Sequence, residues 1–139
     1  MSEARGEMLA ALKEVIIPVL RDMGFSGSFP HFRRIRESQN DLLTLQFNRH
    51  GSSFVIEVSF CDPAGFTTSW EKFTPPNKVN AHDMNPYKRL RLGSPSPKED
   101  GRWFSYESKS SEKYRNTALK VLQLLKSQAE SYWQNPSCS

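Results

Sequence analysis

The chain has 139 residues, of which 37% are hydrophobic and 24% are charged, and its formal net charge is +4. This length suits one domain with one core, and this composition excludes an intrinsically disordered chain. The two cysteines, Cys61 and Cys138, exclude a disulfide framework, and no apolar run is long enough for a signal peptide or a membrane span, so we expect a cytoplasmic protein. We expect a single domain at 1–139, an ordered core at 8–133 and loose termini at 1–6 and 135–139.

The first predicted element is an amphipathic helix, because apolar residues recur at intervals of three and four. Pro18 lies inside this pattern and should kink the last turns. Gly24 suits the left-handed position after the helix, where Phe25 can fold back on Leu20 in a Schellman cap. The apolar stripe comprises Met8, Leu9, Leu12, Val15, Ile16, Val19, Leu20 and Met23.

The segment 29–36 is predicted to be a strand, and Pro30 suits an edge or a strand start. Its three arginines, Arg33, Arg34 and Arg36, form the first basic cluster. Side chains alternate on a strand, so Arg34 and Arg36 share a face and Arg33 points the other way. A charged edge that discourages strand-to-strand aggregation is one explanation, and Arg34 is also a candidate binding residue.

The centre of the fold is predicted to be a hairpin of strands 42–48 and 53–61, entered through a turn at 38–41. Apolar and polar residues alternate along both strands, which gives the sheet one apolar face and one largely polar face. We expect the terminal helices to cover the apolar face and to leave the polar face wet. The apolar positions are Leu43, Leu45, Phe47, Phe54, Ile56, Val58 and Phe60, and the outer polar positions are Gln46, Asn48, Glu57 and Ser59.

The segments after the hairpin have weaker patterns. Residues 62–65 form a predicted turn and 66–70 a short strand. Residues 74–86 contain three prolines and are predicted to be a long loop, of a kind that is often functional or mobile. Trp70 and His82 are candidate binding residues in this region.

Two further strands are predicted at 87–93 and 102–107, around a turn-rich segment at 94–101. The final helix begins near Ser110, with a serine cap and the acidic Glu112 in its first turn. We therefore predict an α+β fold, with an antiparallel sheet of about four to six strands and the N-terminal and C-terminal helices packed on one face. The stripe of the final helix comprises Tyr114, Ala118, Val121, Leu122, Leu125, Ala129 and Tyr132 or Trp133.

Short motifs follow one another along most of the chain, and they comprise Met23-Gly24-Phe25, Phe32-Arg33, Leu45-Gln46-Phe47-Asn48, the alternating Phe54 to Phe60, Arg89-Leu90-Arg91-Leu92-Gly93 and Asp100-Gly101-Arg102-Trp103-Phe104. From about Met8 to Trp133 the chain resembles a bacterial family, domain of unknown function 4304 (DUF4304). Phe104 stands where that family usually has a second tryptophan. The resemblance implies a small cytoplasmic α+β fold without an assigned activity. Similar small domains often occur as immunity proteins beside toxins, which is an analogy of context.

The search for catalytic motifs gives no metalloprotease helix, nucleophile elbow, phosphate-binding loop or paired-cysteine motif. His31, His50 and His82 lack the spacing of metal ligands, so we expect no metal and no cofactor. A Cys61 nucleophile is conceivable, but it requires an exposed and acidified thiol. Glu57 beside arginines is more often a cross-strand ion pair than a general base. We therefore lean toward a protein that is not an enzyme.

The remaining candidate is a binding surface on the outer sheet face, because amides, guanidiniums and tryptophan suit recognition of a protein or a small anion. An alternative is that Arg89 or Arg91 only holds the strands together through Asp100 or Glu107. We expect a non-enzymatic protein-binding module, of the toxin-immunity or inhibitor kind, with a nucleic-acid or small-anion-binding module as the alternative. The candidate binding residues are Arg34, Gln46, Asn48, Glu57, Trp70, His82, Arg89, Arg91 and Trp103.

Overall fold

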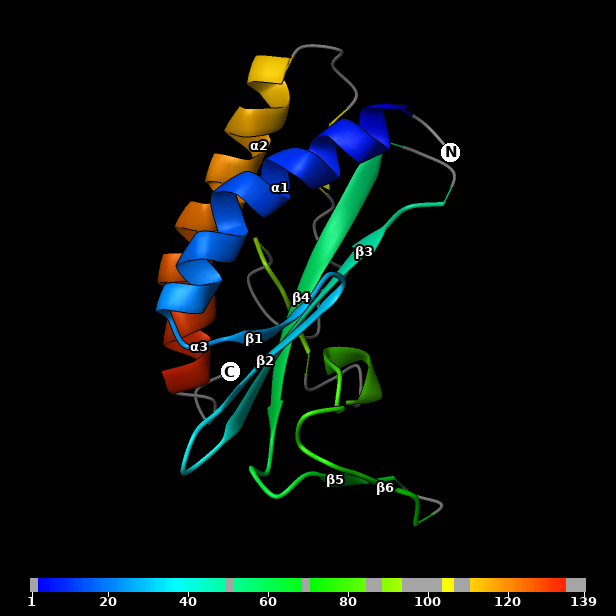
Figure 1. Ribbon diagram of the computed structural model, residues 1–139, viewed down its shortest axis with the longest axis vertical. Coiled ribbons are helices and arrows are strands. Elements are labelled where there is room, and N and C mark those ends of the chain that lie inside the picture. The colour runs from blue at the N-terminus through cyan, green and yellow to red at the C-terminus, as the bar shows by residue number, and fades with distance from the viewer. Residues whose placement is uncertain are drawn as a thin grey trace.

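The computed structural model describes residues 3–49, 52–68, 71–84, 89–93, 104–106 and 111–134. In these residues a six-stranded sheet has the order β1-β2-β3-β4-β7, with β8 also paired to β4, and all of its pairings are antiparallel. The helices cover one face of this sheet (Figure 1), which confirms the predicted α+β class. The strands are β1 (Ser26–Ser28), β2 (His31–Ile35), β3 (Asn40–Phe47), β4 (Ser53–Cys61), β7 (Leu90–Arg91) and β8 (Phe104–Ser105).

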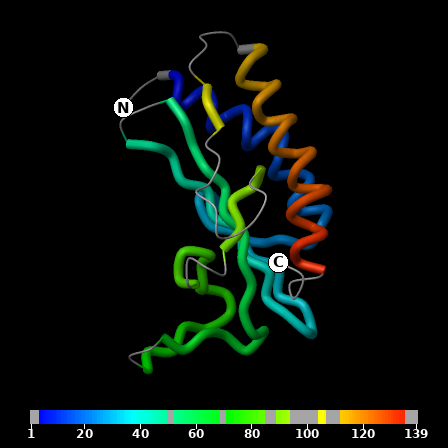
Figure 2. Tube along the Cα trace, turned by 180° about the vertical axis from the view of Figure 1, so that it is seen from behind, coloured from blue at the N-terminus to red at the C-terminus, as the bar shows by residue number. Residues whose placement is uncertain are grey.

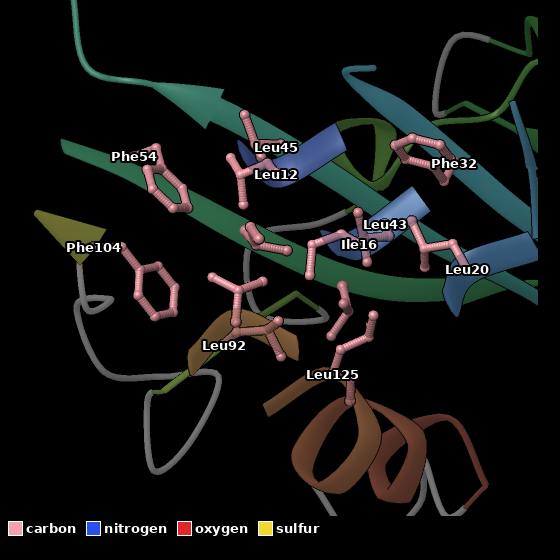
Figure 3. Close-up of a cluster of buried hydrophobic side chains, with 14 of the residues drawn as sticks. Leu12, Ile16, Leu20, Phe32, Leu43, Leu45, Phe54, Leu92, Phe104 and Leu125 are labelled. Carbon is pink, nitrogen blue, oxygen red and sulfur yellow. The ribbon is translucent and has the colours of Figure 1, made fainter. Parts of the chain in front are cut away.

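Strands β3 and β4 form the predicted central hairpin, with Leu43 opposite Val58 and Leu45 opposite Ile56. These four side chains are at most 4% exposed and lie in the main core under the helices. Figure 3 shows that this core fills the space between the sheet and the helices. The alternation read from the sequence therefore sets which face the helices cover.

Helix α1 (Glu3–Asp22) starts earlier than predicted, because residues 3–6, expected in the loose terminus, are helical. It ends as predicted. Gly24 has a φ of 99°, its N–H donates to the carbonyl of Arg21, and the N–H of Phe25 donates to the carbonyl of Leu20. These two bonds form a Schellman cap, and Phe25 and Leu20 are both buried in the core.

The C-terminal helical segment comprises α2 (Ser111–Leu124), a π-helical turn η3 (Leu125–Ala129) and α3 (Glu130–Gln134). It runs beside α1 on the same side of the sheet in both views (Figures 1 and 2), and α1 and α2 are in contact. The predicted stripe is confirmed except that Leu122 is only partly buried against the core. The stripe residues that are at most 6% exposed are Tyr114, Ala118, Val121, Leu125, Ala129, Tyr132 and Trp133.

Several boundaries differ from the sequence prediction. Asn40 and Asp41 were expected in a turn but begin β3, and the short edge strand β1 was missed. Of the predicted strand at 66–70, Phe66–Thr67 forms β5, Thr68 is not in a strand, and 69–70 lie outside the described residues. Strand β5 pairs with β6 (Phe73–Thr74) in a separate two-stranded sheet. The predicted strands at 87–93 and 102–107 are described only as β7 and β8.

The segment 71–84, which we call the strap, lies on the side of the sheet opposite the helices (Figure 2). It contains the 3-10 helix η1 (Ala81–Asp83), and its side chains Val79, Ala81 and Met84 pack on Leu42 of β3 as a second, smaller core. The expectation that the whole outer face is exposed to solvent is therefore wrong, because the strap buries part of that face.

A candidate binding face around Glu57

Glu57 lies in the middle of β4 on the outer face of the sheet, away from the helices. Its neighbours in the register are Thr44 on β3 and Arg91 on β7. Glu57 is only 6% exposed, so its carboxylate has lost most of its water. A buried carboxylate needs charged or hydrogen-bonding partners to compensate for that loss.

Two arginines and a histidine supply this compensation, and together with Glu57 we call them the Glu57 cluster. His82 Nε2 lies 2.8 Å from Glu57 Oε1, and Arg89 Nη1 lies 3.3 Å from the same oxygen. Arg91 Nε donates to Glu57 Oε2 at 3.1 Å. The Arg91 contact is the cross-strand ion pair that the sequence favoured for Glu57. The partners Asp100 and Glu107 that we considered for these arginines lie outside the described residues.

The strap holds two members of this cluster in place. Arg89 Nε donates to the carbonyl of Met84 at 2.9 Å, and its Nη2 donates to the carbonyl of His82 at 3.3 Å. His82 itself lies in η1, whose N-terminus is capped by a capping box formed by Asn80 and Asp83. Arg89 therefore links the strap to Glu57, because it donates to two carbonyls of the strap and also pairs with the buried carboxylate.

The electrostatics keep Glu57 ionised. Burial by itself would raise the pKa of Glu57, but hydrogen bonds from His82 and Arg91 and the charge of Arg89 outweigh it and lower the pKa to about 2. A carboxyl group with so low a pKa is a poor proton acceptor near neutral pH. The cluster is thus arranged as a fixed set of charges rather than as an acid and base pair.

The structure brings four of the predicted binding residues together, namely Glu57, His82, Arg89 and Arg91. Gln46 is exposed on the same outer face, opposite Val55, and Asn48 donates to the hydroxyl of Ser53. Two further predicted residues, Trp70 and Trp103, lie outside the described residues.

Arg34 does not reach the outer face, which corrects our placement of it. It lies on the helix-covered face, where its Nε donates to Asp41 at 2.7 Å and its Nη2 donates to Glu130 on α3 at 3.0 Å. Arg36 binds the same fully buried Asp41. The sequence correctly put Arg34 and Arg36 on one face. Their shared partner Asp41 was missed because it was assigned to a turn and not to the neighbouring strand.

The outer face also contains residues that we did not select. Arg33 Nε donates to the carbonyl of Val79 at 2.9 Å, and Arg33 Nη2 donates to Asn80 Oδ1 at 2.8 Å. His31 Nδ1 lies 3.0 Å from the hydroxyl of Thr44, which also accepts from the N–H of Ala81. The sequence did contain a signal for Arg33, because the alternation along the strand placed its side chain on the face away from Arg34 and Arg36.

The described residues do not support metal or thiol chemistry at this face. Among them, no group of three or more His, Cys, Asp and Glu side chains is placed to hold a metal ion. The pKa of Cys61 is raised to about 11, chiefly by burial and further by the charges of Asp62 and Asp83. A thiol with such a pKa is a weak nucleophile at neutral pH.

Fold and site together define a small two-layer α+β domain with an ion-paired cluster on the sheet face opposite its helices. A family model described as "Domain of unknown function (DUF4304)" matches residues 16–135, so the chain belongs to that family. The resemblance read from the short motifs is confirmed. Neither the curated proteins nor the solved structures gave a match. Within the described residues, every helix is too short or too polar to cross a bilayer.

Proposed function

We propose that this protein is a non-enzymatic, cytoplasmic binding module that uses its outer sheet face to contact an acidic surface of a protein partner. The Glu57 cluster is the observation that carries the proposal. The side chains of His82, Arg89 and Arg91 are 33%, 19% and 30% exposed, although all three contact a carboxylate that is nearly buried. Side chains that are already fixed in place lose little conformational entropy when a partner docks.

The chemistry of these side chains supports recognition of carboxylates. Arginine is enriched among the residues that dominate binding free energy, and its planar fork matches a carboxylate in geometry. Gln46 adds an exposed amide to the same face, two positions along the register from Glu57. A partner surface that carries Asp or Glu would find both charge and hydrogen-bonding complementarity here.

The role that we assign within this class is that of a toxin-immunity or inhibitor protein. A small domain with a rigid polar face suits stoichiometric binding to another protein. This role predicts that the neighbouring reading frame encodes a toxin-like protein with an acidic patch at its binding surface. The product of that reading frame is therefore the partner to test.

The test is co-purification of the tagged chain with the product of the neighbouring reading frame, followed by titration calorimetry of the purified pair. Gln46→Arg should weaken binding at least about tenfold, because it places a bulky side chain in the contact region while leaving the core intact. The matched control is Gln123→Arg on the exposed surface of α2, which should bind as the wild type does. Equal affinities for the two variants and the wild type would reject the outer face as the contact region.

A nucleic-acid or small-anion-binding module is the second candidate, and the charge of the outer face favours it. Among the described residues, this face contains three arginines, Arg33, Arg89 and Arg91, and two carboxylates, Glu57 and Asp83, and the rest of the strap adds the exposed Glu71, Lys72 and Lys78. These groups leave an excess of positive charge when the histidines are neutral. Electrophoretic mobility shifts at increasing salt separate the two candidates, because binding to phosphates weakens steeply as salt is added. Retarded nucleic acid at low salt and its release at high salt would favour this second function.

A further inference from the structure

Among the described residues, Arg33 differs from the other arginines of this region in having no carboxylate within ion-pair distance. Arg34 and Arg36 pair with Asp41, and Arg89 and Arg91 pair with Glu57. Within the described residues, no carboxylate oxygen lies within ion-pair distance of Arg33, although its guanidinium is partly buried. A partly desolvated cation without a counterion is costly, which favours an anion beside it.

The contacts of Arg33 leave one end of its guanidinium available. Its Nε and Nη2 atoms donate to the carbonyl of Val79 and to Asn80 Oδ1, which are both neutral acceptors. The end formed by Nη1 and Nη2 has no further acceptor among the described residues. This end can form a bidentate fork with a carboxylate or a phosphate. Asp83 is the nearby acid: its charge acts on Arg33 from beyond ion-pair distance, and its Oδ2 accepts from the N–H of Asn80.

His31 presents a second donor two residues away on the same strand face. The hydroxyl oxygen of Thr44 accepts from the N–H of Ala81 and lies 3.0 Å from His31 Nδ1. Because this oxygen already accepts one hydrogen bond, we assign the donor role in the second contact to the Thr44 hydroxyl and the acceptor role to His31 Nδ1. Accepting at Nδ1 places the proton of the neutral imidazole on Nε2. Burial, followed by the charges of His82 and Arg33, lowers the pKa of His31, in keeping with a neutral ring.

We propose that Arg33 and His31 form an oxyanion-binding subsite on the outer face, which accepts a carboxylate or phosphate group between the free end of the guanidinium and the His31 Nε2–H donor. The strap builds the subsite, because Val79 and Asn80 orient Arg33 and Ala81 orients Thr44. The subsite is separate from the Glu57 cluster, although the rings of His31 and His82 lie 6.5 Å apart in an edge-on arrangement. It is compatible with either function proposed above and depends on neither.

Nuclear magnetic resonance of the isotope-labelled full chain tests this subsite directly. Sodium phosphate and sodium acetate are titrated separately, with sodium chloride at matched ionic strength as the reference. We expect a saturable shift of the Arg33 Nε–H signal and a rise in the pKa of His31, because a bound anion favours the imidazolium form. Saturation by phosphate identifies a phosphoryl ligand, and saturation by acetate identifies a carboxylate ligand.

Variants give the deciding result. Arg33→Gln should abolish the saturable shift in His31, and Arg33→Lys should weaken it at least about tenfold because lysine lacks the fork. His31→Asn, which leaves the bonds of Arg33 to the strap intact, should weaken anion binding as seen at Arg33. The control Arg115→Gln removes a 58% exposed guanidinium from α2 and should respond as the wild type does. The proposal would be overturned if phosphate and acetate shifted the signals of Arg33 and His31 no more than chloride does. It would also be overturned if the shift of His31 were unchanged in a folded Arg33→Gln variant.

Discussion

The indole Nε1 of Trp133 donates a hydrogen bond to the backbone carbonyl of Ser59 at 3.0 Å, and both residues are at most 1% exposed. Ser59 comes directly after the two β4 residues that pair with β7. The C-terminal helix thus supplies a donor to a buried carbonyl just where the β7 pairing stops. Buried backbone carbonyls that lose their partner are costly, so this bond should contribute measurably to stability.

We predict that Trp133→Phe lowers the free energy of unfolding by about 2 kcal/mol or more, since it removes the buried hydrogen bond to the Ser59 carbonyl and creates a small cavity. Urea denaturation measures the change. The control Ser131→Ala alters an exposed residue of the same helix and should change stability by less than about 0.5 kcal/mol. A Trp133→Phe protein as stable as this control would show that the hydrogen bond contributes nothing.

Glu57→Gln should destabilise the fold by about 3 kcal/mol or more, because it removes the buried carboxylate that pairs with Arg89 and Arg91. A matched control is Glu14→Gln, whose carboxylate is 75% exposed and lies 3.7 Å from Arg115. Exposed ion pairs contribute about 0–1 kcal/mol, so the control should be nearly neutral. Similar losses in the two variants, measured by chemical denaturation at pH 7, would contradict the role of the Glu57 cluster.

The stability difference between wild type and Glu57→Gln should depend on pH. The pKa of Glu57 is about 2 in the folded protein and 4.5 in the unfolded reference, so its carboxylate stabilises the fold fully above pH 4.5. This contribution, about 3 kcal/mol from the size of the shift, is lost as the pH falls toward 2. Urea denaturation at several pH values should show the two proteins converging in acid, whereas a constant difference would argue against the low pKa.

Cys61 should react slowly with alkylating agents in the folded protein. Its pKa of about 11, against an ordinary 9.0, leaves roughly 100-fold less thiolate at neutral pH. Iodoacetamide labelling of a Cys138→Ser protein, followed by mass spectrometry with and without urea, measures the difference. Equal rates in the two conditions would reopen the possibility of a reactive thiol.

The helix-covered half of the fold could be predicted from the sequence because its signals are local and periodic. The spacing of Leu12, Ile16 and Leu20 and the alternation of Leu43 and Leu45 each specify which side chains must be buried together. The Gly24-Phe25 cap follows from the same kind of local rule. Strand lengths after β4 could not be predicted, because β7 and β8 are too short to show a period.

The outer face was harder to predict, because its arrangement depends on contacts distant in sequence. Arg33 meets Val79 and Asn80 across an interval of more than 40 residues, and the strap shows no periodicity that would place it on the sheet. The sequence identified Glu57, Arg89 and Arg91 as members of one face but not the strap that encloses them. It also placed Arg34 at the border of this face, since its partner Asp41 was assigned to a turn.

The position of the strap has a consequence for how this fold can diversify. Its 3-10 turn lies on the side of the sheet opposite the helices, while the larger core is packed between helices and sheet. Changes in the length or sequence of the strap can therefore alter the outer face while leaving the larger core untouched. We expect relatives to tolerate insertions and substitutions in this segment more readily than at the residues packed between helices and sheet.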